Sequence, residues 1–187
     1  MSEKIIKRHT VYNGKYLILD IVNVKQPNDQ IADREVVTVP DAVGILPIGW
    51  DGKIHLVKQF RPAIDKYTIE VPAGLIDDEE TPEEAARREL REELGLKGPL
   101  KRVNSFYHAE GYSSGKTHLF VCENAILTSK PKLDSTEFIE KYIVTYTELG
   151  NMINSGEIQD PKTIILFLSY RIHNLRNHQK LEEDSDV

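Results

Sequence analysis

The segment from Gly74 to Leu96 constrains the fold more than any other part of this chain of 187 residues. Thr81 stands before Pro82, and Glu84 follows Thr81 by three residues, a pattern that predicts a capped helix start at the proline. Gly95 can take the left-handed backbone conformation that often follows the last residue of a helix. The sequence therefore predicts one helix between these two signals.

One face of this predicted helix gathers glutamates beside an apolar stripe. At about 100° per residue, Glu89, Glu92 and Glu93 fall on an arc of about 100°. An ordinary solvated acidic helix is the alternative interpretation, but Glu89 has no cation at helical spacing, and each like-charge pair costs about 0.2–0.5 kcal/mol. Clustered oxygen ligands suit Mg²⁺ or Mn²⁺, and a magnesium that keeps its waters typically also binds substrate phosphates. The spacing therefore predicts a divalent-cation site.

Composition and charge exclude several classes of protein. The chain has 24 basic and 30 acidic residues, a formal net charge of −6, so no nucleic-acid partner and no membrane partner is expected. The longest purely apolar run, from Ile164 to Leu168, is too short to cross a bilayer. No apolar signal region follows Met1, and the single cysteine, Cys122, permits no intrachain disulfide. We expect a cytoplasmic protein.

Turn signals divide the chain into predicted parts. Asn13-Gly14 lies between two apolar stretches, which predicts a hairpin, and residues 1–40 read as an antiparallel three-stranded sheet too small to be stable alone. Residues 41–180 intermix strands and helices, which predicts an α+β domain with a mixed sheet between helices. Its closing helices are predicted near 147–154 and 161–173. The acidic tail, 181–187, is predicted to be disordered.

The segment from Gly74 to Leu96 resembles the Nudix box, Gly-x5-Glu-x7-Arg-Glu-U-x-Glu-Glu-x-Gly-U, in which U is a bulky aliphatic residue. Every defined position matches, at Gly74, Glu80, Arg88, Glu89, Leu90, Glu92, Glu93, Gly95 and Leu96. The resemblance implies the Nudix fold, a mixed β-sheet sandwiched between helices. It also implies a small-molecule substrate, a nucleoside diphosphate linked to another group, whose diphosphate is hydrolysed.

The resemblance gives these residues two kinds of role. Two or more Mg²⁺ ions, with Mn²⁺ possible, are expected to be held by the carbonyl oxygen of Ala73 and the carboxylates of Glu89, Glu92 and Glu93. Glu92 and Glu93 thereby also count as catalytic. A structural role is expected for Gly74, Glu80, Arg88 and Gly95, among which Glu80 and Arg88 form the pair that ties the loop to the helix.

The flanking sequences resemble the ADP-ribose pyrophosphatase branch of the family, which includes ADP-sugar hydrolases. The similarity rests on Val57–Pro62 and Ile69–Asp77 and runs from Ala42 to Tyr146. It implies Mg²⁺-dependent hydrolysis of ADP-ribose to AMP and ribose 5-phosphate, and a homodimer formed through the N-terminal sheet. Another nucleotide sugar (ADP-, GDP- or UDP-linked) is the alternative substrate. A catalytically silent ADP-ribose sensor is a third interpretation, and an RNA-cap hydrolase is disfavoured by the acidic charge.

Residues outside the box are expected to contact the substrate. Arg61 carries a planar, always-charged fork suited to a phosphate or ribose, with a surface salt bridge as the alternative. Glu70 is expected to accept a ribose hydroxyl or to join the metal network, with a simple strand-end charge as the alternative. The aromatic residue that stacks on the base is left open among Tyr12, Tyr16, Phe106 and Tyr112.

A general base is needed to activate water near the metals. The segment from Lys132 to Glu140 resembles the loop that carries this base in the branch, with Glu137 at the matching position and Asp134 and Glu140 as competitors.

The loop from His108 to Lys116 departs from the branch at two positions. Glu110 replaces a proline before Gly111, and Gly115 stands where a glutamate is frequent. Glu110 and Gly111 are kept as candidate substrate contacts. His108 and His118 have no metal-ligand spacing and are expected to be non-catalytic.

Overall fold

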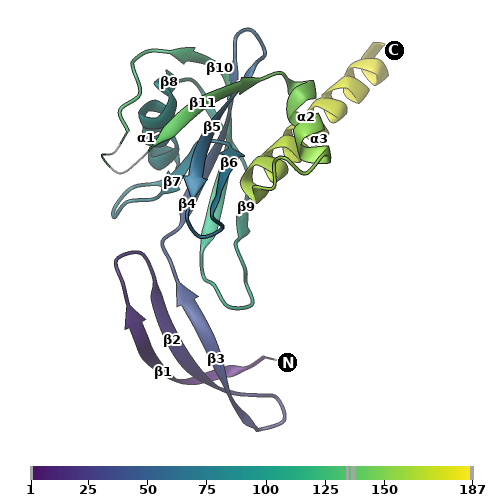
Figure 1. Cartoon of the computed structure of the whole chain (residues 1–187). Helices are drawn as coiled ribbons and strands as arrows, with labels where there is room; N and C mark the ends of the chain where they lie inside the picture. The colour runs from purple at the N-terminus through teal and green to yellow at the C-terminus, as the bar shows by residue number, and fades with distance from the viewer. Residues whose placement is uncertain (1, 134, 136–137, 186–187) are drawn as a thin grey trace. The chain divides into compact units, whose positions relative to one another are not determined.

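The computed structural model describes residues 2–133, 135 and 138–185, with side chains as far as residue 175 (Figure 1). The chain divides into two compact units. One unit contains Met1–Ala42 and Ser105–Thr117, and the other contains Val43–Asn104 and His118–Val187. The predicted division into residues 1–40, 41–180 and 181–187 stays a prediction.

The first unit is built on an antiparallel three-stranded sheet, as predicted. Its strands, in the order β1-β2-β3, are Lys4–Asn13, Ile18–Lys25 and Ile31–Thr38. Asp20 on β2 is buried, and its carboxylate accepts hydrogen bonds from Arg8 at 2.6 Å and from the hydroxyl of Thr10 at 2.7 Å. These bonds from β1 satisfy the buried charge and lock the two strands together.

The loop after β9 adds a short extension to this sheet. The backbone N–H of Val37 on β3 donates to the carbonyl of Tyr112 at 2.7 Å, and the N–H of Ser114 donates back to Val37 at 3.0 Å. Val37 and Ser113 thereby form a parallel bridge. The backbone N–H of Val39 also donates to the hydroxyl of Ser114, 75 residues further along the chain. The edge of β3 is therefore paired by a segment that is distant in the sequence.

Most of the second unit is built on an eight-stranded sheet with helices on both sides (Figure 1). The order β11-β5-β4-β10-β8 forms its path, while β6 pairs with β5, β7 with β4 and β9 with β10. The strands are β4 (Ala42–Gly49), β5 (Ile54–Arg61), β6 (Lys66–Glu70), β7 (Ala73–Leu75), β8 (Leu96–Lys97), β9 (Leu100–Tyr107), β10 (Lys116–Leu127) and β11 (Ile139–Val144). This arrangement confirms the predicted α+β class with a sheet between helices.

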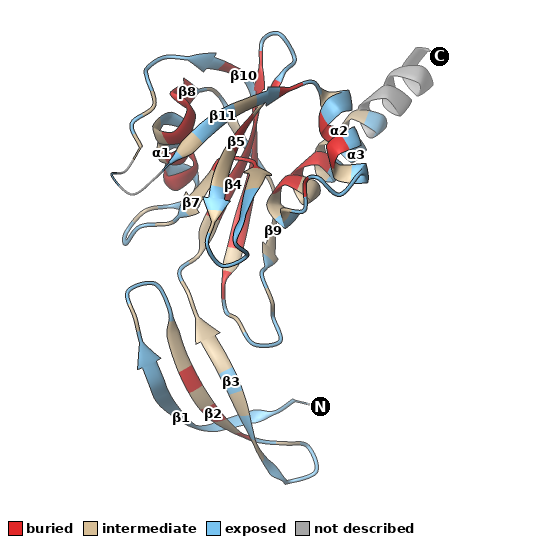
Figure 2. Ribbon diagram, viewed as in Figure 1, coloured by how far each residue is buried: buried red, intermediate tan, exposed pale blue. Residues whose placement is uncertain are grey.

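Helix α1 (Pro82–Leu94) covers one face of this sheet and is capped as predicted. The Thr81 hydroxyl accepts from the N–H of Glu84, the Glu84 carboxylate accepts from the N–H of Thr81, and Gly95 ends the helix with φ at 71°. Its buried stripe packs on apolar side chains of β4, β5 and β10 (Figure 2). The core on this side contains Val43, Ile45, Val57, Ala85, Ala86, Leu90, Leu94, Leu96, Phe120, Cys122 and Ala125.

Helices α2 (Tyr146–Asn154) and α3 (Pro161–Ser185) lie on the other side of the sheet (Figure 1). α3 continues past His173, where the end of the apolar pattern had predicted its end, because no glycine or proline follows Pro161 to stop it. Residues 181–185, predicted to be disordered, are helical. In the described part of the chain, no helix is both long enough and apolar enough to span a bilayer.

Candidate active site

Two buried carboxylates of α1 face the loop around β7. Glu93 is 3% exposed, and its Oε2 accepts a hydrogen bond from the backbone N–H of Ala73 at 3.1 Å. Glu89, one turn earlier on the helix, is 7% exposed and lies against Gly74, where an added Cβ would stand 1.8 Å from the Glu89 Oε1. Gly74 is therefore required for the close approach of this carboxylate. The structure brings together the predicted ligands Ala73, Glu89 and Glu93.

Arg88 ties the loop after β7 to α1. Its Nε and Nη2 bind the two carboxylate oxygens of Glu80 at 3.0 and 2.9 Å, and Nη2 also donates to the carbonyl of Leu75 at 2.9 Å. Its Nη1 reaches Glu89 at 2.6 Å and Glu92 at 3.3 Å. The hydrogen bonds from Arg88 hold the pKa of Glu80 below its usual value. One guanidinium thus organises the loop and two of the three predicted acidic ligands.

The chemistry of this cluster fits a hard divalent cation. Arg88 shares a single positive charge among four carboxylates, those of Asp77, Glu80, Glu89 and Glu92. Among the described residues, no three His, Cys, Asp or Glu side chains lie close enough together to form a complete metal-binding site. Mg²⁺ does not require such a site, because it commonly uses one or two carboxylates together with waters and substrate phosphates. The oxygen donors around Ala73 suit that mode of binding.

Arg61 and Glu70 bind each other in a two-pronged ion pair. Arg61 Nε and Nη2 donate to the two carboxylate oxygens of Glu70 at 2.8 and 2.7 Å. Burial on its own raises the pKa of Glu70, but the hydrogen bonds from Arg61 and Thr68 and the charge of Lys162 lower this pKa to about 2. Glu70 is therefore a carboxylate at all ordinary pH values. The hydrogen bonds that Arg61 donates to Glu70, followed by the negative charges of Glu70, Asp160 and Glu93, raise the pKa of Arg61.

The loop from His108 to Lys116 belongs to the first unit. Glu110 is exposed, and a Cβ added to the adjacent Gly111 would meet no atom within 4 Å. At Gly115 an added Cβ would lie 2.5 Å from Val39 Cγ2 and 2.6 Å from His108 Nδ1. A side chain at position 115 would therefore require His108 and Val39 to move.

His108 and His118 each bind a neighbouring side chain. His108 Nε2 lies 2.6 Å from the hydroxyl of Thr117, and His118 Nδ1 lies 2.7 Å from Arg102 Nη2. Neither contact involves a residue of the glutamate cluster. The non-catalytic interpretation of both histidines stays a prediction.

The candidate bases occupy the connection before β11. Glu137 and Asp134 lie outside the described residues, while Glu140 is in β11 opposite Lys58. Both ends of the connection are fixed: the N–H of Lys132 donates to the carbonyl of Glu92 at 2.8 Å, and β11 pairs with β5. The ammonium of Lys141 donates to the carbonyl of Leu94 at 2.7 Å. The connection is therefore anchored at the C-terminal end of α1.

The structure does not single out one aromatic side chain for stacking on a base. Tyr12, Tyr16 and Tyr112 are exposed, and Phe106 makes an edge-on contact with His108. All four belong to the first unit. The choice among them stays open.

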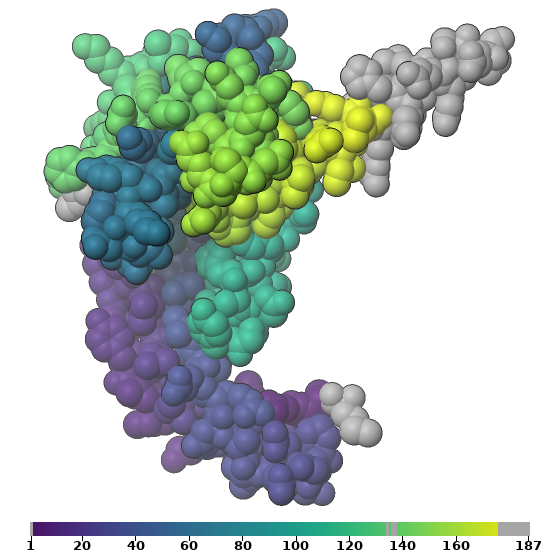
Figure 3. Space-filling view, turned by 45° about the vertical axis from the view of Figure 1, so that its right-hand side comes forward, coloured from purple at the N-terminus to yellow at the C-terminus, as the bar shows by residue number. Residues whose placement is uncertain are grey.

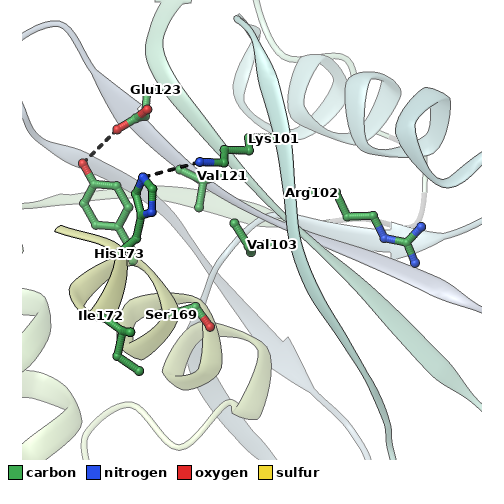
Figure 4. A pocket seen from close by; sticks show the side chains of 9 residues that line it. Lys101, Arg102, Val103, Val121, Glu123, Ser169, Ile172 and His173 are labelled. Atoms are coloured by element: carbon green, nitrogen blue, oxygen red, sulfur yellow. Dashed lines mark hydrogen bonds between the residues drawn. The ribbon is translucent and has the colours of Figure 1, made fainter. Parts of the chain in front are cut away.

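A separate cavity of about 220 Å³ lies between β9, β10 and α3 (Figure 4). Tyr170 donates to Glu123 at 3.1 Å, and Lys101 Nζ lies 3.4 Å from His173 Nε2. Arg102 points away from these side chains in Figure 4. None of the predicted site residues lines this cavity, so it is not part of the glutamate site.

The family model of the NUDIX domain matches residues 38–167 of the chain. The chain belongs to the Nudix family. It is a Nudix hydrolase, as the match of the complete box predicted. Among curated proteins it is 34% identical over 184 residues to the ADP-ribose pyrophosphatase of Bacillus subtilis (strain 168), with 97% of each chain covered. It is 32% identical over 182 residues to the methanol dehydrogenase activator of Bacillus methanolicus, covering 95% of this chain and 97% of that protein.

The fold of this Nudix hydrolase is also found in a solved crystal structure of an ADP compounds hydrolase. The two structures superpose with a TM-score of 0.83 over 95% of this chain and 96% of that one, at 22% sequence identity. The similarity therefore extends over the N-terminal sheet as well as the Nudix domain.

Two charged residues of this Nudix hydrolase that the sequence did not predict lie next to the site: Lys162 contacts Glu70, and Asp160 contacts Lys162. Lys162 lies 3.2 Å from a carboxylate oxygen of Glu70, and Asp160 lies 2.5 Å from Lys162. Asp160 before Pro161 is a recognisable helix start, since aspartate is a favoured N-cap and proline a favoured first residue. The contact between Lys162 and Glu70 spans 92 residues and carries no local signal.

Proposed function

We propose that this Nudix hydrolase cleaves the diphosphate of ADP-ribose to give AMP and ribose 5-phosphate. The observation that carries the proposal is the pair of buried glutamates, Glu89 and Glu93, packed against the Ala73-Gly74 backbone. The similarity to an ADP-ribose pyrophosphatase along 97% of the chain supports the choice of substrate. The low exposure of Glu89 and Glu93, 7% and 3%, supports a role for these carboxylates inside the site rather than at the solvated surface.

The carboxylates of Glu89, Glu92 and Glu93 and the carbonyl of Ala73 would hold Mg²⁺ or Mn²⁺, with two or more ions per site. When bound, such ions polarise the diphosphate and make a water molecule easier to deprotonate. Arg88 would keep the acidic side chains in position through its contacts with Glu89 and Glu92. Glu92 is the most exposed of the three, which suits a ligand at the open side of the site.

Arg61 would bind a phosphate oxygen of the substrate. Its side chain is 40% exposed, and only its Nε and Nη2 are used by Glu70, so further N–H donors remain for a ligand. A fixed positive charge beside the diphosphate stabilises the negative charge that develops as the bond breaks. Glu70, held by three partners, would act by orienting Arg61 rather than by accepting a ribose hydroxyl.

Glu137 would act as the general base, with Asp134 and Glu140 as competitors. It would take the proton from the attacking water, whose oxygen bonds to one phosphorus while the bridging P–O bond breaks. The anchoring of Lys132 to Glu92 supports this assignment, because it ties the connection that carries the base to α1. Glu110 and Gly111 remain proposed substrate contacts.

The experiment that tests the proposal is product analysis across a panel of nucleotide sugars with saturating Mg²⁺. ADP-ribose is expected to be hydrolysed faster than ADP-glucose, UDP-glucose and GDP-mannose, with AMP and ribose 5-phosphate as products. Faster hydrolysis of another nucleotide sugar would contradict ADP-ribose as the substrate but would support the proposed hydrolysis of a diphosphate. Tight binding of ADP-ribose with no AMP formed would instead support a regulatory protein, the alternative favoured by the similarity to a methanol dehydrogenase activator.

We also propose a homodimer formed through the N-terminal sheet. Every residue of β1 is exposed, including the apolar Ile5, Ile6 and Val11. An isolated three-stranded sheet buries little apolar surface by itself, so a second copy would supply the missing cover. A cytoplasmic location is proposed on the basis of Cys122, a single buried thiol.

A further inference from the structure

A continuous series of charged contacts connects Arg61 to the start of α3. Arg61 forms its two-pronged pair with Glu70, Glu70 accepts from the ammonium of Lys162 at 3.2 Å, and Lys162 donates to Asp160 at 2.5 Å. The side chain of Arg61 is the most exposed of the series, at 40%, whereas those of Glu70, Lys162 and Asp160 are 4%, 18% and 7% exposed. Only the Arg61 end is open to a ligand.

The inner end of this series is fixed by the fold. Asp160 caps α3, because its carboxylate accepts from the N–H of Thr163 at 2.9 Å and from the Thr163 hydroxyl at 2.6 Å. The same hydroxyl accepts from the backbone N–H of Val71 at 2.9 Å. The first turn of α3 is thereby joined to the chain immediately after Glu70.

The aliphatic stem of Lys162 is held as well. Its Cβ and Cδ lie over Gly44 of β4, where an added Cβ would stand 3.5 Å from both. The ammonium is therefore delivered to Glu70 by a packed side chain rather than by a mobile one. A buried ion pair costs solvation energy that only well-placed partners offset, so each member of this series depends on the others for its position.

The exposed end of the series borders a cavity. A space of about 380 Å³ lies between the hairpin that joins β5 to β6 and the segment that joins α2 to α3. Arg61, Glu70 and Asp160 are among its lining residues. Figure 3 shows this side of the second unit, with the blue-teal hairpin next to the green α2. Three members of the charged series therefore form part of the wall of this cavity.

We propose that Lys162 and Asp160 are positioning residues that hold Glu70, and through it Arg61, in the orientation that receives the substrate's diphosphate. The inference rests on the proposed phosphate-binding role of Arg61. Glu70 has two oxygens, and Lys162 binds the one that also faces Arg61 Nη2. Without the ammonium of Lys162, the Glu70 carboxylate loses one of its partners and can rotate, and the guanidinium of Arg61 can then turn with it. A substitution that keeps the aliphatic stem of Lys162 is expected to retain the fold.

The test is a double-mutant cycle between Lys162 and Arg61. Lys162→Met keeps the packed stem and removes the charge, and it is expected to raise the KM for ADP-ribose about tenfold, a coupling of the size found within shared hydrogen-bond networks. Arg61→Lys keeps a positive charge but cannot form the fork on Glu70. In that background, Lys162→Met is expected to change KM less than threefold. Lys162→Arg is expected to restore most of the affinity.

Two further variants separate positioning from general damage. Asp160→Asn keeps a good N-cap for α3 but weakens the hold on Lys162, and it is expected to raise KM by a smaller factor than Lys162→Met. Lys53→Met removes an exposed lysine of the β4–β5 hairpin and is the matched control, with KM unchanged. The dissociation constant of ADP-ribose without added metal gives the same cycle a readout that needs no turnover.

Equal effects of Lys162→Met in the wild-type and Arg61→Lys backgrounds would overturn the inference, because a purely structural role predicts additivity. An unchanged KM and dissociation constant in Lys162→Met would also overturn it. A wild-type protein that binds but does not hydrolyse ADP-ribose would overturn the proposed function alone, and the binding cycle would still decide the inference. A wild-type protein that does neither would overturn both.

Discussion

At Gly74, the absence of a side chain decides where a carboxylate of α1 can lie. The Glu89 Oε1 stands 1.8 Å from the place a Cβ would take, so any other residue must push the carboxylate or the loop aside. This contact was predictable from the Nudix box. Glycine, glutamate and arginine at fixed spacing specify this packing, and all nine box positions could be recognised from the sequence alone.

Gly74→Ala is therefore expected to lower kcat/KM for ADP-ribose about 100-fold, because a metal ligand is displaced. The midpoint of thermal unfolding is expected to fall only slightly, since the loop is at the surface. Steady-state kinetics and thermal melts check both quantities. Gly150→Ala in α2, where Phe167 leaves 3.0 Å for the new methyl group, is the control and should keep its activity. Wild-type kinetics in Gly74→Ala would refute the role given to this contact.

Glu70 predicts a specific dependence of stability on pH. Its pKa of about 2 lies below the usual value of 4.5, so its ionised form stabilises the fold above pH 4.5. That stabilisation, on the order of 3 kcal/mol, is lost as the pH falls from 4.5 towards 2. The free energy of unfolding of Glu70→Gln should therefore fall less steeply than that of the wild type over this window. Denaturant titrations at several pH values measure the two slopes, and parallel slopes would contradict the expectation.

Among the elements, α1 was predictable at both ends and α3 at only one. α1 has a capping box and a C-terminal glycine, which are local signals. α3 has its proline at the start, but the sequence marks no stop, so the end of the apolar pattern was a poor guide. The pairing of residues 112–114 with β3 could not be predicted either, because it joins distant segments through backbone groups. The contact of Lys162 with Glu70 was missed for the same reason of distance along the chain.

Lys141 provides a test of how β11 is fastened to α1. Its ammonium donates to the carbonyl of Leu94 in the last turn of the helix, where positive charge is favoured. Lys141→Met should lower the free energy of unfolding by about 1 kcal/mol. Lys25→Met, which removes an exposed pair with Asp29, is the control and should cost less than about 0.5 kcal/mol. Equal losses in the two variants would show that the contact with Leu94 is weak.

For the whole molecule, the exposed apolar residues of β1 predict the assembly. Ile5→Lys and Val11→Lys place charges on a strand that is exposed along its full length, and they are expected to convert the proposed dimer to a monomer. Sedimentation velocity measures the mass of each species. Ile172→Lys, at an exposed position of α3, should leave the dimer intact. A wild-type chain that sediments as a monomer would remove the proposed dimer.

The glutamates of α1 are proposed to hold divalent cations when the substrate is bound. The most direct measurement is Mn²⁺ binding, followed by electron paramagnetic resonance, to wild type and to Glu93→Gln in the presence of a non-hydrolysable ADP-ribose analogue. We predict that Glu93→Gln binds Mn²⁺ at least about tenfold more weakly and loses about 10³-fold in turnover, with an unchanged fold. Wild-type Mn²⁺ affinity and full hydrolysis of ADP-ribose in Glu93→Gln would contradict the claim.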